Sequence, residues 1–191
     1  MRRQKASFVL GDHMKSFVVA IPAALSMFGA AAAATVNFDY AGAPVQVDGL
    51  FTDVGFNVVA SPGATIDGMT VTLDFTKCDD PINAAGDCLG AGFSFNNEIQ
   101  FILTSPDATS VTLIAAGAYS GQTPGDRVVV TFDDAAASAV GGALLADGTF
   151  RPTGLLSAFI GEIVSGLWTL RVQDTVGADP LQLNDFQVAF E

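Results

Sequence analysis

Apolar and polar residues alternate along most of the chain, and this period of two is typical of strands with one buried face. The clearest run is 69–77, where every second residue from Met69 to Phe75 is apolar. Further strands are expected over 35–40, 54–60, 98–104, 110–115, 127–133, 166–174 and 183–190. Gly, Pro, Asn and Asp separate these runs, as turns require. Many short strands predict an all-β fold, a jelly-roll-like β-sandwich.

Three segments depart from this alternation. The Ala-rich stretch 134–140 is expected to form one helical turn or a loop, and 155–164 a short helix across one end of the sandwich. The segment 141–153 reads as a long exposed loop, because Gly and polar residues interrupt it.

The N-terminal segment has the features of a secretory signal peptide, with Met14 as the expected start. One Lys precedes the apolar run 17–34, which ends in three alanines. A transmembrane helix is the alternative, since the run is about long enough to span a bilayer. The alanines and the absence of a basic residue before Lys77 favour cleavage near Ala34. The expected product is a secreted or periplasmic single domain, 35–191, with no membrane contact.

Cleavage would change the charge of the chain markedly. Four of the eight basic residues and one of the twenty acidic residues precede Thr35, so the remainder carries four basic and nineteen acidic residues, a net charge of −15. Phosphate binding needs clustered Lys and Arg. The composition therefore argues against a nucleic-acid partner and suits a soluble exterior that attracts cations.

Cleavage would also remove His13, the only histidine. Without it the chain cannot build a Ser-His-Asp or Cys-His site, or a zinc site of the His-containing kind. A Ser-Lys pair would depend on Lys77 alone. Two carboxylates acting as acid and base, as in glycosidases, are the common hydrolytic scheme that remains open. Because no histidine would be left for a catalytic triad, we expect that the chain is not an enzyme.

The two cysteines, Cys78 and Cys88, are expected to form a disulfide, as an even pair does in an exported chain. They enclose 79–87, which has loop composition. The bridge would close an insertion between two strands and contribute about 2.5–3 kcal/mol at most. Two free thiols or a two-Cys metal site are the alternatives.

The C-terminal part carries a distinctive order of motifs. Phe-x-Pro at 150–152 and Leu-x-x-x-Phe-x-Gly at 155–161 precede Gly-x-Trp-x-Leu-x-Val-x-Asp at 166–174, and Leu-x-x-Phe-x-Val follows at 183–188. This order resembles the closing half of the P domain (Homo B domain), which follows the subtilisin-like catalytic domain of proprotein convertases. Four residues of the last two motifs are expected in the core: Trp168, Leu170, Val172 and Phe186.

The opening half of the resemblance is weaker. The segment 62–73 matches the first strand of the family, but Lys77-Cys78 stands where His-Thr would fall and Glu98-Ile99 where Asp-Leu would fall. Ser-Pro-x-Gly-Thr is present at 105–109, with Ala in place of Gly. The resemblance covers about 60–190.

The resemblance implies a domain without catalytic residues, which in the convertases packs on the protease, stabilises it and tunes its calcium and pH response. We expect the domain here to be free-standing, without a catalytic domain in front of it. The expected function is that of an exported binding or structural module. The alternative is an accessory or regulatory domain of a subtilisin-like serine protease supplied in trans. Either way the partner is an extracellular or periplasmic protein, and no cofactor is required.

Acidic residues gather near the disulfide loop and in the closing hairpin. Carboxylates and carbonyls in such loops could supply the oxygens that calcium takes. Solvated turn residues are the alternative, since Asp is common in turns, and no Asp-x-Asp-x-Asp-Gly loop is present. The candidate calcium ligands are Asp79, Asp80, Asp87, Glu98, Asp174 and Asp179.

Overall fold

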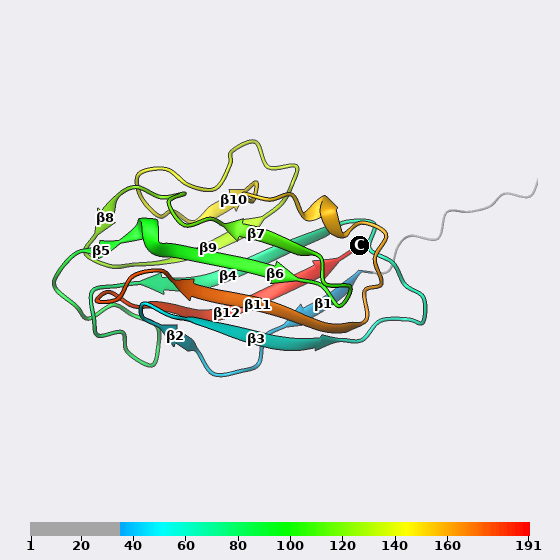
Figure 1. Cartoon of the computed structure of the whole chain (residues 1–191), viewed down its shortest axis with the longest axis horizontal. Helices are drawn as coiled ribbons and strands as arrows, with labels where there is room; N and C mark the ends of the chain where they lie inside the picture. The colour runs from blue at the N-terminus through cyan, green and yellow to red at the C-terminus, as the bar shows by residue number, and fades with distance from the viewer. Residues whose placement is uncertain (1–34) are drawn as a thin grey trace, which may run out of the picture. The chain divides into compact units, whose positions relative to one another are not determined.

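The computed structural model describes residues 35–191, and the predicted signal peptide, 1–34, lies outside the described residues. Two β-sheets pack face to face (Figure 1). In spatial order the first contains β1 (Val36–Asp39), β12 (Leu181–Phe190), β4 (Met69–Lys77), β9 (Asp126–Phe132) and β10 (Gly148–Phe150), with β2 (Val45–Val47) also paired to β12. The second contains β3 (Phe51–Val58), β11 (Gly166–Asp174), β6 (Ile99–Thr104) and β7 (Ser110–Ile114). The predicted all-β sandwich is confirmed.

A small third sheet covers one end of the sandwich. It consists of β5 (Ser94–Phe95) and β8 (Gln122–Thr123), which pair antiparallel. The helical structure within 35–191 is confined to two 3-10 turns, η1 (Asn96–Glu98) and η2 (Leu156–Phe159). No helix in this part of the chain is long and apolar enough to cross a membrane.

The alternation of apolar residues fixes how the strands pair, because a slip of one residue would turn the buried face to solvent. β4 lies between β12 and β9, and β11 lies between β3 and β6, all antiparallel. A register shift between Leu183 and Asp185 interrupts the β12–β4 pairing. Beyond it Phe186, opposite Leu73, is turned inward and buried.

The core lies between the inward faces of the two sheets. Trp168 is fully buried and packs against the rings of Phe56, Phe159 and Phe190. Its indole Nε1 donates a hydrogen bond of 3.0 Å to the carbonyl of Val164, so the polar end of the ring is satisfied. The other three residues named for the core, Leu170, Val172 and Phe186, are also buried.

The connecting segments differ from the sequence expectations. The expected long loop 141–153 contains β10, which pairs in parallel with β9, and Phe150 packs against the core. The short helix expected over 155–164 is reduced to η2, whereas 134–140 forms a loop, one of the two forms expected for it. A strand of three residues shows too little alternation to be recognised, which explains why β10 was missed.

Candidate functional site at one end of the sandwich

A buried ion cluster lies at one end of the sandwich, where β4 and β11 finish. The inward face of β4 continues from Phe75 to Lys77, and the inward face of β11 continues from Val172 to Asp174. Lys77 has 0% and Asp174 has 1% of its surface exposed. The alternation that builds the core therefore places two opposite charges between the sheets.

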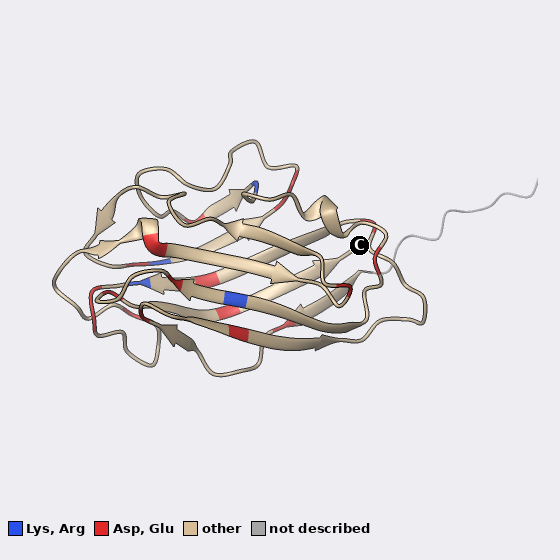
Figure 2. Ribbon diagram, viewed as in Figure 1, with Lys and Arg blue, Asp and Glu red and all other residues tan. Residues whose placement is uncertain are grey.

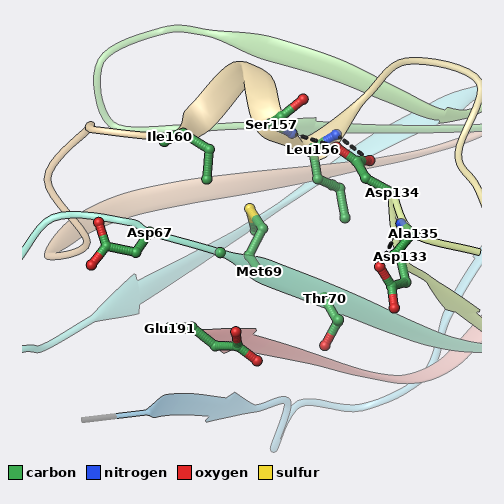
Figure 3. Close-up of a pocket in the computed structure, with 11 residues that line it drawn as sticks. Asp67, Met69, Thr70, Asp133, Asp134, Ala135, Leu156, Ser157, Ile160 and Glu191 are labelled. Atoms are coloured by element: carbon green, nitrogen blue, oxygen red, sulfur yellow. Dashed lines mark hydrogen bonds between the residues drawn. The ribbon is translucent and has the colours of Figure 1, made fainter. Parts of the chain in front are cut away.

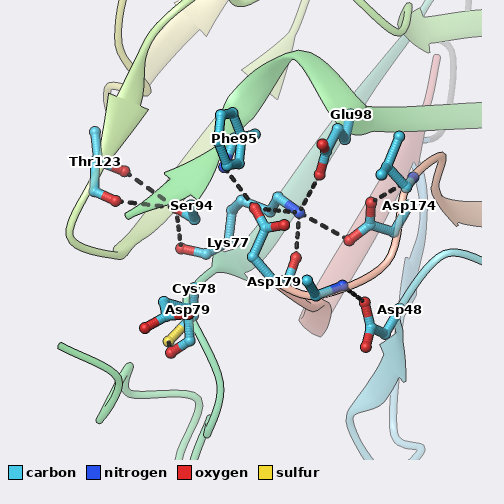
Figure 4. A network of polar contacts seen from close by, with 12 residues as sticks. Asp48, Lys77, Cys78, Asp79, Ser94, Phe95, Glu98, Thr123, Asp174 and Asp179 are labelled. Atoms are coloured by element: carbon cyan, nitrogen blue, oxygen red, sulfur yellow. Dashed lines mark hydrogen bonds and ion pairs between the residues drawn. The ribbon is translucent and has the colours of Figure 1, made fainter. Parts of the chain in front are cut away.

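The ammonium group of Lys77 is surrounded by oxygen atoms (Figure 4). Nζ donates hydrogen bonds to Asp174 Oδ2 at 2.8 Å and to Glu98 Oε2 at 3.1 Å, and lies 3.0 Å from Asp179 Oδ2. It also donates to the main-chain carbonyl of Asp179. These groups come from the end of β11, from η1, and from the loop before β12. One side chain thus ties four segments together.

Burial and contacts within the cluster shift the pKa values of Lys77, Asp174 and Glu98. Burial pushes the pKa of Lys77 down, but hydrogen bonds and charges from Asp174, Asp179 and Glu98 outweigh it, and the pKa is raised. Burial raises the pKa of the Asp174 and Glu98 carboxyls, and the hydrogen bonds from Lys77 offset this only in part. The lysine is therefore held charged, while the Asp174 and Glu98 carboxyls take up protons more readily than ordinary carboxyls do.

Of the six candidate calcium ligands, the structure brings together Glu98, Asp174 and Asp179. Their oxygens do not fit a calcium ion as they stand, because Lys77 Nζ occupies the point on which they converge. No group of three or more His, Cys, Asp or Glu side chains within 35–191 is arranged to hold a metal ion.

The other three candidates, Asp79, Asp80 and Asp87, lie in the disulfide loop. Asp79 Oδ2 accepts a hydrogen bond of 2.7 Å from the N–H of Gly92, and Asp87 Oδ2 accepts one of 3.0 Å from Asn83. Asp80 is exposed. Local hydrogen bonds of this kind are what Asp makes in turns.

Lys77 was not predicted at the centre of this cluster, although the sequence carries a signal for it. Counting by two from Phe75 places Lys77 on the buried face of its strand, and counting by two from Val172 does the same for Asp174. A charged residue on a buried face needs an oppositely charged partner. That argument predicts that each of the two residues has a buried partner, and the fold shows that they are partners of each other.

The predicted disulfide is present and adjoins the cluster. Cys78 directly follows Lys77, and its Cα lies 5.5 Å from that of Cys88, to which it is bonded. The N–H of Cys78 donates to the carbonyl of Pro180 at 3.1 Å, next to Asp179. The covalent bridge and the ion cluster therefore fasten the same end of the sandwich.

The chain leaves the disulfide loop through residues 89–95, which we call the 89–95 segment, and this segment exposes large apolar side chains. Leu89, Phe93 and Phe95 have 62%, 63% and 42% of their surface exposed. The backbone is nevertheless fixed, because Phe95 N–H donates to Asp179 Oδ2 at 2.5 Å and Gly92 N–H donates to Asp79. The segment is an apolar surface held by the cluster and the disulfide loop.

A cleft of about 360 Å³ lies at a different place, beside η2 (Figure 3). Four carboxylates line it, but none of them is buried. Asp134 accepts hydrogen bonds from the N–H groups of Leu156 and Ser157, both at 2.8 Å, and so caps η2. Two buried carboxyls facing each other, which a glycosidase-like mechanism needs, are not found in this cleft.

The fold is that of an all-β domain, and the buried charged groups at its end contact one another. Comparison with protein families identifies its class: the model of the proprotein convertase P-domain matches residues 93–190, slightly more than half of the chain. The chain belongs to this family, whose members are non-catalytic accessory domains of subtilisin-like convertases. The match begins at Phe93, so it includes Glu98-Ile99 and 105–109 from the opening half of the resemblance but leaves out residues 60–92. No curated protein matches the chain.

Proposed function

We propose that the chain is an exported, non-catalytic binding module that contacts a protein partner outside the cytoplasm through the 89–95 segment. The observation that carries this proposal is the exposure of Leu89, Phe93 and Phe95 on a fixed backbone. Neighbouring exposed apolar side chains mark interaction surfaces. Aromatic residues are also the usual anchors of protein interfaces.

The fixed backbone strengthens this proposal energetically. Binding has to compensate for the entropy lost when loops and side chains become ordered. The 89–95 segment is already ordered by Asp79, by Asp179 and by Ser94, whose hydroxyl lies 3.4 Å from the carbonyl of Lys77. A partner would therefore meet a surface that needs little rearrangement.

A subtilisin-like serine protease carried by another chain is the second candidate for the partner, and membership of the P-domain family favours it. In this case the module would be an accessory or regulatory domain. The two candidates share the same docking segment and differ only in what is bound.

The charges of the domain argue against a nucleic-acid partner. Residues 35–191 contain four basic side chains, scattered over the fold (Figure 2). Lys77 is buried, and Arg127 and Arg171 each form two hydrogen bonds with one carboxylate, Asp74 and Asp53 respectively. No cluster of free basic groups is left for phosphates.

Affinity capture tests the proposal. The purified protein serves as bait for culture supernatant and periplasmic extract, and bound chains are identified by mass spectrometry. We expect a protein that the double variant Phe93→Ser/Phe95→Ser no longer retains. Leu167→Ser is the matched control, because Leu167 on β11 is 65% exposed but lies outside the segment. A partner that the double variant retains as well as the wild type does would contradict the docking site.

A serine-directed covalent probe on the captured complex separates the two candidates. Labelling of a co-purifying chain would identify a serine protease partner, whereas an unlabelled partner supports a binding module of another kind. Capture of no protein by the wild type would overturn both.

Export is tested separately by the intact mass of the protein recovered outside the cytoplasm. We expect an N-terminus at or near Thr35. A mature protein that keeps 17–34 would instead be membrane-anchored, and the proposed localisation would be wrong.

A further inference from the structure

We propose that the ammonium group of Lys77 takes the place of a bound metal ion, so that the domain holds Glu98, Asp174 and Asp179 together without calcium. This inference concerns the domain itself and does not depend on the proposed partner. It also assigns a role to a buried cation that the P-domain match, beginning at Phe93, does not include.

The surroundings of Nζ are those of a cation site. Three carboxylate oxygens and one main-chain carbonyl converge on Nζ, and the three carboxylate oxygens lie 2.8–3.1 Å away. Calcium takes only oxygen ligands of this kind, at about 2.3–2.6 Å. The same oxygens would therefore need to move inward by about 0.5 Å to hold calcium in place of nitrogen.

The charges of the cluster also indicate that the three carboxylates need a cation. Three ionised carboxylates and one ammonium carry a net charge of −2, and Lys77, Asp174 and Asp179 are at most 4% exposed. An isolated buried charge is very costly. If the ammonium is removed, the carboxylates can become neutral only by taking up protons, whereas a divalent cation would restore the charge balance directly.

The position of the cluster explains why a permanent cation is useful there. Nζ joins the last residues of β4 and β11, which belong to opposite sheets, to η1 and to the loop before β12. A metal ion would join these segments only when its free concentration is high enough for it to stay bound. A covalently attached ammonium joins them under all conditions in which the lysine stays charged.

Two substitutions of Lys77 separate charge from space. Lys77→Ala removes the charge and leaves room for an ion with water ligands, whereas Lys77→Met removes the charge but fills the same space. Arg171→Ala is the control, because it breaks an exposed ion pair with Asp53, which is not one of the three carboxylates around Lys77. The thermal midpoint of the purified full chain is measured in EDTA and in CaCl₂ at about 10 mM, an excess over the millimolar affinities of extracellular calcium modules.

We expect the midpoints of the wild type, Lys77→Met and Arg171→Ala to be the same in both buffers. The midpoint of Lys77→Ala in EDTA should be lower than that of the wild type and should rise by about 3–10 °C with calcium. If calcium neither raises the midpoint of Lys77→Ala nor restores its folding where the variant is unfolded in EDTA, the proposal is wrong. It is also wrong if Lys77→Met responds, or if calcium raises the midpoint of the wild type and Glu98→Gln abolishes that rise.

Discussion

At the scale of single residues, the charge of Lys77 should account for much of the stability at its end of the sandwich. Lys77→Met leaves three buried carboxylates without their cation, and breaking a buried ion pair in this way costs about 3–5 kcal/mol of unfolding free energy. The loss should be smaller at pH 5 than at pH 8. The reason is that burial raises the pKa of the Asp174 and Glu98 carboxyls, so that without their cation they are neutralised more readily as the pH falls.

Urea denaturation of wild type and variant at both pH values measures this difference. Arg171→Met is the control and should cost about 1 kcal/mol or less, because its ion pair with Asp53 is exposed. An equal loss of stability at pH 5 and pH 8 would show that the carboxylates do not compensate for the missing charge.

Asp74 should likewise contribute more to stability at high pH than at low pH, although its pKa is shifted in the opposite direction from those of Asp174 and Glu98. Hydrogen bonds from the Arg127 guanidinium hold the pKa of this carboxyl below its usual value. A carboxyl whose pKa is lower in the folded state stabilises the fold above its unfolded pKa, and this contribution disappears as the pH falls through the folded value. Asp74→Asn should therefore cost about 1 kcal/mol at pH 7 and less at about pH 2. Unfolding free energies at the two pH values decide this, and a constant difference would contradict it.

Sequence reasoning reached some of these residues and not others. When a chain contains two cysteines, each has only one possible intramolecular partner. The disulfide between Cys78 and Cys88 could therefore be predicted from the sequence. The partners of Lys77 lie 21, 97 and 102 residues away, and only the fold brings them together. The alternation along the strand could predict that Lys77 lies inside the sandwich, but not that it contacts Asp179.

At the scale of elements, strands with one buried face were predictable and short strands were not. β4 occupies the expected range 69–77 and β11 the range 166–174, because nine residues give several cycles of alternation. β5 and β8 contain two residues each and β2 three, so their sequences show no period. Their positions are set by the longer strands and loops around them.

Reducing the disulfide should loosen one loop rather than unfold the domain. The bridge joins residues only ten positions apart, so the loop-closure entropy predicts a loss of about 2.5–3 kcal/mol at most. The Lys77 cluster, which fastens the same end, does not depend on the bridge. Urea denaturation of Cys78→Ser/Cys88→Ser measures the loss, and alkylation of the wild type should detect no free thiol. Complete unfolding of the double variant would show that the bridge stabilises more than this loop.

The same variant bears on the docking segment. Without the bridge the 89–95 segment keeps its hydrogen bonds to Asp79 and Asp179 but loses the covalent closure of the loop in front of it. We expect the double variant to remain folded but to capture less partner than the wild type does. The reason is that the 89–95 segment would then have to become ordered on binding. Unchanged capture would mean that the hydrogen bonds alone fix the segment.

At the scale of the whole molecule, the buried ion cluster, the disulfide and the exposed 89–95 segment lie at one end of the sandwich. The reason is topological: β4 and β11 end there, and the loop between Cys78 and Cys88 leaves from the last residue of β4. The charged groups are used to hold this end together, and its apolar groups face outward. Such an arrangement suits recognition better than chemistry.

The purified domain should accordingly cleave no peptide at any pH between about 4 and 9. Activation of a serine needs a nearby base, and the only histidine, His13, precedes the proposed cleavage site. Lys77 is the only lysine beyond that site, and it is buried with its pKa raised by Asp174, Asp179 and Glu98, so it is held charged and cannot accept a proton. Fluorogenic peptides and a serine-directed covalent probe test this. Labelling of a serine in this chain, lost when that serine is changed to Ala, would refute it, because it would require a base that neither His13 nor Lys77 provides.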